Sequence, residues 1–141
     1  MCSSDLKQIP NNSKITIKAK KMPETKNKKP YDLEKRTLQF AKEVIGLCKK
    51  LPKEVINAKL VDQVVRAAGS VGANYREANE AISKKDFLHR LRIARKEAKE
   101  CSYWLELIKD ANREHLDAAE ELFAESIELR KILNSIIEKS S

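Results

Sequence analysis

Positively charged side chains recur at helical spacing within residues 83–110. The steps between five of them are 4, 3, 4 and 3 residues, which places all five along one side of a helix. We define these five residues as the basic row: Lys85, His89, Arg92, Lys96 and Lys99. Cationic rows attract phosphate groups without reading base sequence, so this one predicts contact with a polyanion. The predicted nucleic-acid-binding residues are Lys84, Lys85, His89, Arg92, Arg95, Lys96 and Lys99.

A solvated helix face is the alternative interpretation of the same residues. Charged rows on helices are usually balanced by acids three or four positions away. Glu97 and Glu100 stand where they could balance part of this row. Between residues 84 and 99, however, seven Lys and Arg side chains stand against two acids. The sequence leaves both interpretations open.

Three aromatic side chains are candidates for base stacking, which strengthens the binding of single strands. They are Tyr75, Tyr103 and Trp104. Tyr75 follows the apolar spacing of its own helix, so we expect it in the core rather than on the surface.

The net charge of +8 is unevenly divided along the chain. Residues 1–30 carry eight lysines against Asp5 and Glu24, whereas residues 31–141 carry 21 basic and 19 acidic side chains. Residues 110–128 hold seven acids against one base. Nucleic-acid binding must therefore be inferred from where charges stand in the folded part, not from the isoelectric point.

No residue pattern predicts catalysis, a metal site or a cofactor. Cys48 and Cys101 each fall on an apolar helical stripe, which is typical of small core residues rather than nucleophiles. His89 and His115 have no serine or cysteine at a spacing that would form a catalytic pair. Four-helix bundles can hold metals with Glu-x-x-His motifs, but the only similar fragment starts at Asp86, which is expected to cap a helix. We expect a protein that is not an enzyme.

Cysteine usage and hydropathy point to the cytoplasm as the expected location. Three scattered cysteines give neither a disulfide framework nor metal-ligand spacing, which favours a reducing compartment. No apolar run approaches the roughly 18 residues that a membrane span needs. The N-terminus lacks the apolar region of a secretory signal. We therefore expect no contact with a membrane.

Helical apolar spacing accounts for the chain after its first 30 residues. Residues 1–30 are polar, lysine-rich and interrupted by prolines, which predicts a disordered basic tail. Residues 31–138 are predicted to form one all-α domain, because glycine and aromatic residues are scarce. Short connections favour antiparallel neighbours, so the expected fold is an antiparallel up-down-up-down four-helix bundle. Its helices are predicted at about Leu33–Leu51, Asn57–Ala81, Ser83–Asp110 and Asp117–Ile137.

Two helices carry features that predict unusual packing. The first has a second apolar stripe beside its main one, which predicts contact with two or more neighbouring helices. The second contains almost only small side chains around Gly69 and Gly72. A glycine inside a helix costs about 1 kcal/mol of stability relative to alanine. We expect close approach of another helix to offset that cost. The second stripe of the first helix is Leu38, Ala41, Ile45 and Cys48.

Five segments have distinctive residue orders: YDLEKR at 31–36, LPK at 51–53, VGANYREA at 71–78, KDFLHRL at 85–91 and the run 97–105 that ends in Tyr-Trp-Leu. Together they resemble a family of small bacterial four-helix bundle proteins. Some members are encoded by intervening sequences in 23S ribosomal RNA genes, and the accessory variability protein of diversity-generating retroelements is similar too. The resemblance covers about residues 31–138 and leaves out the basic tail.

This resemblance implies a homopentameric barrel of four-helix protomers that binds RNA or DNA. In the retroelement member, a reverse transcriptase is a further partner. The family has no established enzymatic activity. We therefore expect a non-catalytic, oligomeric nucleic-acid-binding accessory protein, without cofactor, that helps a reverse transcriptase or acts on structured RNA. The alternative is a protein-interaction bundle whose basic row docks an acidic protein partner.

Overall fold

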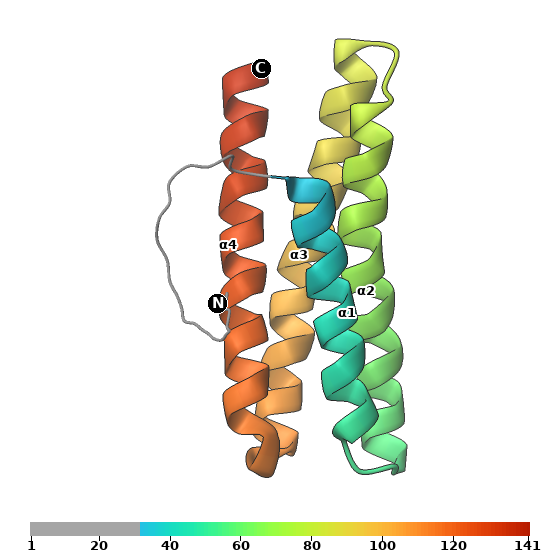
Figure 1. Ribbon diagram of the computed structural model, residues 1–141, viewed down its shortest axis with the longest axis vertical. Coiled ribbons are helices and arrows are strands. Elements are labelled where there is room, and N and C mark those ends of the chain that lie inside the picture. The colour runs from blue at the N-terminus through green and yellow to red at the C-terminus, as the bar shows by residue number, and fades with distance from the viewer. Residues whose placement is uncertain (1–31) are drawn as a thin grey trace. The chain divides into compact units, whose positions relative to one another are not determined.

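Four α-helices make up the part of the chain that the computed structural model describes, residues 32–141. They are α1 (Leu33–Lys50), α2 (Val55–Asn79), α3 (Lys84–Ala111) and α4 (Leu116–Ser140), with a short 3-10 helix, η1 (Arg113–His115), before α4. Successive helices run in opposite directions (Figure 1). The predicted antiparallel four-helix bundle is confirmed, whereas the predicted basic tail, residues 1–30, lies outside the described residues.

The helices of the bundle pack unequally. α3 lies between α2 and α4 and packs extensively against both, while α1 packs mainly on α2 and less on α4. α1 is also the shortest of the four α-helices, and it begins well below the turn that joins α2 to α3 (Figure 1). Where α1 is missing, α2 and α3 therefore depend on each other for burial, and α3 also on α4.

The apolar seams of the four helices meet in one core. Burial of aliphatic side chains is the main favourable contribution to such a fold, at roughly 25 cal/mol per Å² of apolar surface. The fully buried residues lie at helical spacing and include members of every helix: Phe40 and Val44, Val64 and Val71, Leu91 and Leu105, Leu129 and Leu133.

The two cysteines of the described chain belong to this core. Cys101 is fully buried and Cys48 almost so. Burial raises the pKa of Cys48 to about 11 and that of Cys101 to about 12, because an apolar surrounding disfavours the thiolate. Both thiols are therefore protonated at neutral pH, and they fill space as predicted.

Helix ends follow local capping. Ser83 Oγ accepts a hydrogen bond of 3.1 Å from the Asp86 backbone N–H, as predicted for the start of α3. The predicted start of α2 at Asn57 is wrong by two residues. The Glu54 carboxylate accepts a 2.6 Å hydrogen bond from the Ile56 N–H and starts the helix at Val55. Val55 and Ile56 are exposed, so they do not follow the buried spacing used for the prediction.

The predicted close packing in the middle of α2 is confirmed at one glycine and wrong at the other. A Cβ atom on Gly72 would lie 3.0 Å from Thr37 Oγ1 and 3.3 Å from Thr37 Cβ on α1. A Cβ atom on Gly69 would meet nothing within 4 Å, and this residue is exposed. Only Gly72 allows the two helices to approach closely.

Candidate nucleic-acid interface

The basic row lies on the face of α3 that points away from the core. All five of its side chains are exposed. At about 100° per residue, the centre of the row lies about 180° from Ala94, which is fully buried. The row therefore stands opposite the buried seam of α3, not merely beside it. From Lys85 to Lys99 it extends about 21 Å along the helix axis.

The structure separates two of the predicted binding residues from the row. Arg95 is half-buried, and its Nη1 donates a 2.6 Å hydrogen bond to Asn134 Oδ1 on α4. Lys84 is exposed, but it lies about 100° around the helix from Lys85. Another cation of the segment, Arg90, is half-buried and donates to Asn74 Oδ1 on α2 at 3.4 Å.

Arg66 on α2 binds both of the acids, Glu97 and Glu100, that could balance part of the row. Its Nη1 lies 3.2 Å from Glu97 Oε1, and its Nη2 lies 2.8 Å from Glu100 Oε1. The hydrogen bond to Glu100, followed by the charge of Glu97, raises the pKa of the Arg66 guanidinium, which stays protonated. Sequence reasoning missed this pairing because Arg66 lies more than 30 residues from either acid.

The row consequently keeps its positive charge. Within the described part of the chain, none of its lysine and arginine side chains forms an ion pair with a carboxylate. Arg66 offsets one of the two negative charges of Glu97 and Glu100, so the four fixed charges of the row exceed the acidic charge left beside it. Contact with a polyanion and a solvated helix face both stay predictions for this row.

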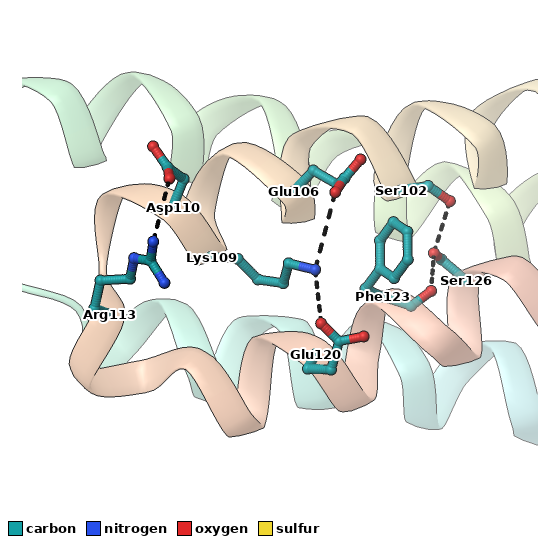
Figure 2. Close-up of polar contacts among 8 residues, drawn as sticks. All are labelled: Ser102, Glu106, Lys109, Asp110, Arg113, Glu120, Phe123 and Ser126. Carbon is teal, nitrogen blue, oxygen red and sulfur yellow. Dashed lines mark hydrogen bonds and ion pairs between the residues drawn. The ribbon is translucent and has the colours of Figure 1, made fainter.

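The cation near the C-terminal end of α3, Lys109, is paired with acids, unlike the cations of the basic row. Lys109 Nζ lies 2.6 Å from Glu120 on α4 and 3.9 Å from Glu106, and it stands 4.6 Å from the centre of the Phe123 ring (Figure 2). Its side chain is only 18% exposed. This lysine holds α3 to α4, so the available positive charge of the exposed α3 face ends at Lys99.

Acids of the 110–128 segment are likewise engaged within the bundle. Glu125 accepts two hydrogen bonds from Arg36 on α1, at 2.7 and 2.9 Å. Glu120 binds Lys109, and Glu128 lies 3.8 Å from Lys131. The acidic segment therefore serves partly to join α4 to its neighbours.

The three aromatic candidates occupy different environments. Tyr75 is half-buried against the core, as predicted. Tyr103 is 60% exposed, and its position continues the spacing of the basic row by one further step of four residues. Trp104 is half-buried, meets the Tyr103 ring edge-on at 5.1 Å, and has a buried Nε1 without a hydrogen-bond partner among the described residues.

An apolar groove of about 770 Å³ lies between the end of α1 and the beginning of α2. Ile45, Cys48, Leu51 and Val55 are among its lining residues. Ile45 remains 42% exposed, and Leu38, on the same stripe of α1, is 44% exposed. The second apolar stripe of α1 is therefore only partly covered by the other described helices.

No group of three or more His, Cys, Asp or Glu side chains in residues 32–141 is arranged to hold a metal ion. None of the helices in this range combines the length and the apolar composition required to cross a bilayer.

Comparison with known proteins finds a matching family and a similar crystal structure. The structure, from Bacteroides thetaiotaomicron, is described as a protein with unknown function from the S23 ribosomal protein family. It shares 37% identity with this chain at a TM-score of 0.67, covering 74% of this chain and 97% of its own. A search of curated proteins finds no match. The sequence profile of the 23S rRNA-intervening sequence proteins matches residues 29–135, and the chain therefore belongs to that family.

Proposed function

We propose that this protein is a non-catalytic, oligomeric accessory protein that binds nucleic acid through the exposed face of α3. The observation that carries the proposal is the capture of Glu97 and Glu100 by Arg66. Arg66 offsets part of the acidic charge beside the basic row, and none of the row's lysine or arginine side chains is ion-paired within the described chain, so Lys85, Arg92, Lys96 and Lys99 remain available for phosphate groups. His89, in the same row, can donate a hydrogen bond to a phosphate oxygen.

Structured RNA is the preferred ligand in this proposal. The family takes its name from an intervening sequence of 23S ribosomal RNA, which supports RNA ahead of DNA. Assistance to a reverse transcriptase is a second candidate role, supported only by the similarity to the retroelement protein. Phosphate contacts fix position without reading sequence, so neither role requires base-specific side chains.

Self-association into a homopentamer is the second part of the proposal. Leu38 and Ile45 expose more than two-fifths of their surface on one side of α1, and the apolar groove lies along the same side. Contiguous exposed apolar surface commonly marks contact with another protein. Several copies would also bring several basic rows to one polyanion, which increases avidity. Light scattering measures the number of copies directly.

The salt dependence of binding tests the phosphate contacts. Four neutralised phosphates predict that the logarithm of affinity falls by about 2.8 per log unit of salt for single strands and about 3.6 for B-form duplex. The triple variant Arg92→Glu, Lys96→Glu and Lys99→Glu should lose most of its affinity for RNA in filter binding at low salt. Its fold should persist, because exposed substitutions usually change stability little.

A matched triple variant controls for the change in net charge. Lys42, Lys59 and Lys139 are exposed on α1, α2 and α4, so changing all three to Glu alters the net charge equally but leaves the row intact. This control should retain most of the affinity. Equal loss in both variants would show that only total charge matters. Undiminished binding by the row variant, with unchanged light scattering, would reject the basic row as the contact.

Docking of an acidic protein remains the alternative function. The same exposed cations support it, since a carboxylate cluster and a phosphate chain both attract a positive row. Wild-type protein that fails to bind RNA and DNA at low salt would reject nucleic-acid binding and favour this alternative.

A further inference from the structure

We propose that the part of the RNA that the basic row binds is an unpaired, single-stranded segment, and that Tyr103 stacks on one of its bases. This inference rests on the proposed function, because the ring is useful only if the row holds a phosphate backbone beside it. It adds a binding residue and a ligand class that the charges alone do not specify.

The position of Tyr103 supports a shared site. The residue follows Lys99 by four positions, so the two α-carbons are about 6 Å apart along the axis and lie about 40° apart around it. Measured from Lys85, Tyr103 returns to the same angular position, since 18 residues complete five turns. The ring therefore continues the line of cations.

The ring of Tyr103 is also supported and accessible. Trp104 packs against the core. The centre of its ring system lies 5.1 Å from the centre of the Tyr103 ring at an interplanar angle of 71°, which is an edge-on contact. Even so, 60% of Tyr103 is exposed. Its hydroxyl forms no hydrogen bond within the described residues. An aromatic side chain held by one neighbour and otherwise open is suited to receive a flat ligand group.

Stacking on Tyr103 requires a base that is not stacked in a duplex. Single strands present free base faces, and binding sites for them combine a positive track with aromatic rings. Beyond Tyr103, the next exposed positions on this face are Leu107 and Asp110, which provide no cation. The track therefore carries phosphates from Lys85 to Lys99 and ends at the ring. A single row also matches one backbone rather than the two of a duplex.

Three ligands of equal length test this inference on the full-length protein: a 12-nucleotide uridine RNA, the same sugar-phosphate chain with abasic sites, and a 12-base-pair duplex. Binding is followed by fluorescence anisotropy at one low salt concentration. Tyr103→Ala should weaken uridine RNA binding by about 5- to 150-fold, the range found for single base–aromatic stacks. Its binding to the abasic chain and to the duplex should equal that of the wild type.

Conservative variants and the abasic ligand provide independent controls. Tyr103→Phe and Tyr103→Trp keep an aromatic face and should bind uridine RNA as tightly as the wild type. Wild-type protein should itself prefer uridine RNA to the abasic chain, a comparison that involves no substitution. Equal wild-type affinity for these two ligands would overturn the stacking role, even with the basic row still binding phosphate.

Other outcomes separate the two proposals. If Tyr103→Ala weakens all three ligands equally and changes the light scattering, the ring belongs to an interface between copies, and the inference is wrong. If the wild type binds none of the ligands, the proposed function fails. If the duplex and the uridine RNA bind equally and neither responds to Tyr103→Ala, the row binds phosphates without the ring, and only the inference fails.

Discussion

Gly69 and Gly72 stand one helical turn apart on α2, yet they meet different surroundings. Gly72 faces Thr37, a residue that is 1% exposed. The Thr37 hydroxyl donates a 2.7 Å hydrogen bond to the Leu33 carbonyl. Thr37 therefore cannot move aside without loss of a buried hydrogen bond. Gly69 faces open space, so its missing side chain has no packing role within the described bundle.

Alanine substitution at the two glycines should change stability in opposite directions. Gly69→Ala should raise the free energy of unfolding by about 0.5–1 kcal/mol, because alanine loses less backbone freedom in a helix. Gly72→Ala should lower it by about 1–2 kcal/mol, because overpacking against Thr37 exceeds that gain. Urea denaturation at one fixed protein concentration measures both.

A double-mutant cycle identifies the cause at Gly72. In a Thr37→Ala background the hydroxyl is absent, so Gly72→Ala should cost less than in the wild type. The same cost in both backgrounds would show that Thr37 is not the obstacle. A loss of stability in Gly69→Ala would indicate that this glycine faces another copy of the chain.

At the scale of elements, two asparagines join the α1–α2 connection to the end of α3. Asn57 Nδ2 donates to Asn112 Oδ1 at 2.9 Å, and Asn112 Nδ2 donates to Asn57 Oδ1 at the same distance. Asn57 also donates to the Pro52 carbonyl at 3.0 Å, and Asn112 to the Ile108 carbonyl at 3.1 Å. Both residues are 2% exposed. This amide pair satisfies backbone groups at two chain reversals together.

Removing one asparagine of the amide pair should lower the stability of the bundle. Asn57→Ala deletes its hydrogen bonds and leaves the buried amide of Asn112 partly unsatisfied, so the free energy of unfolding should fall by about 2–3 kcal/mol. Asn79→Ala is the matched control, because Asn79 makes one exposed hydrogen bond to Glu34, and it should cost less than about 0.5 kcal/mol. Equal midpoints for the two variants in thermal unfolding would show that the amide pair contributes nothing specific.

For the whole molecule, we expect the bundle and the basic N-terminal segment to contribute separately to stability and to charge. The buried core begins at Leu33 and ends at Ile137, and residues 33–141 form a compact unit of their own. Most of the net charge lies elsewhere, since residues 1–30 account for +6 of the total of +8. Stability should therefore depend on one part of the chain, and long-range attraction of polyanions on both.

Deletion of residues 1–30 tests this division. The number of helical residues by circular dichroism, the unfolding midpoint and the number of copies by light scattering should match those of the full chain, because the buried residues of the described bundle, from Leu33 to Ile137, all remain. RNA affinity should fall only in part, since the basic row remains while net charge drops from +8 to +2. A lower midpoint would show that the segment packs on the bundle. Complete loss of binding would make the segment, and not the row, the main contact.

Local and periodic features of this protein could be predicted from its sequence. Helices follow from apolar residues at helical spacing, and the start of α3 follows from Ser83, which caps a helix that begins at the next residue. The seams become the core because only one side of each helix can be buried in a bundle. The exposure of the basic row follows from the same spacing. These properties depend only on residues within a few helical turns of each other, so they can be predicted from the order of residues in the chain.

Pairing between distant residues was decided by the tertiary structure alone. By sequence spacing, Glu97 and Glu100 could have balanced part of the basic row, and their binding to Arg66 depends on the register between α2 and α3. Gly69 and Gly72 look alike in the sequence, and only the position of α1 distinguishes them. Side-chain partners across a bundle are set by rotation and sliding of whole helices, which the helical period does not fix. For this reason the sequence could locate the cations, whereas the fold determined which of them remain available.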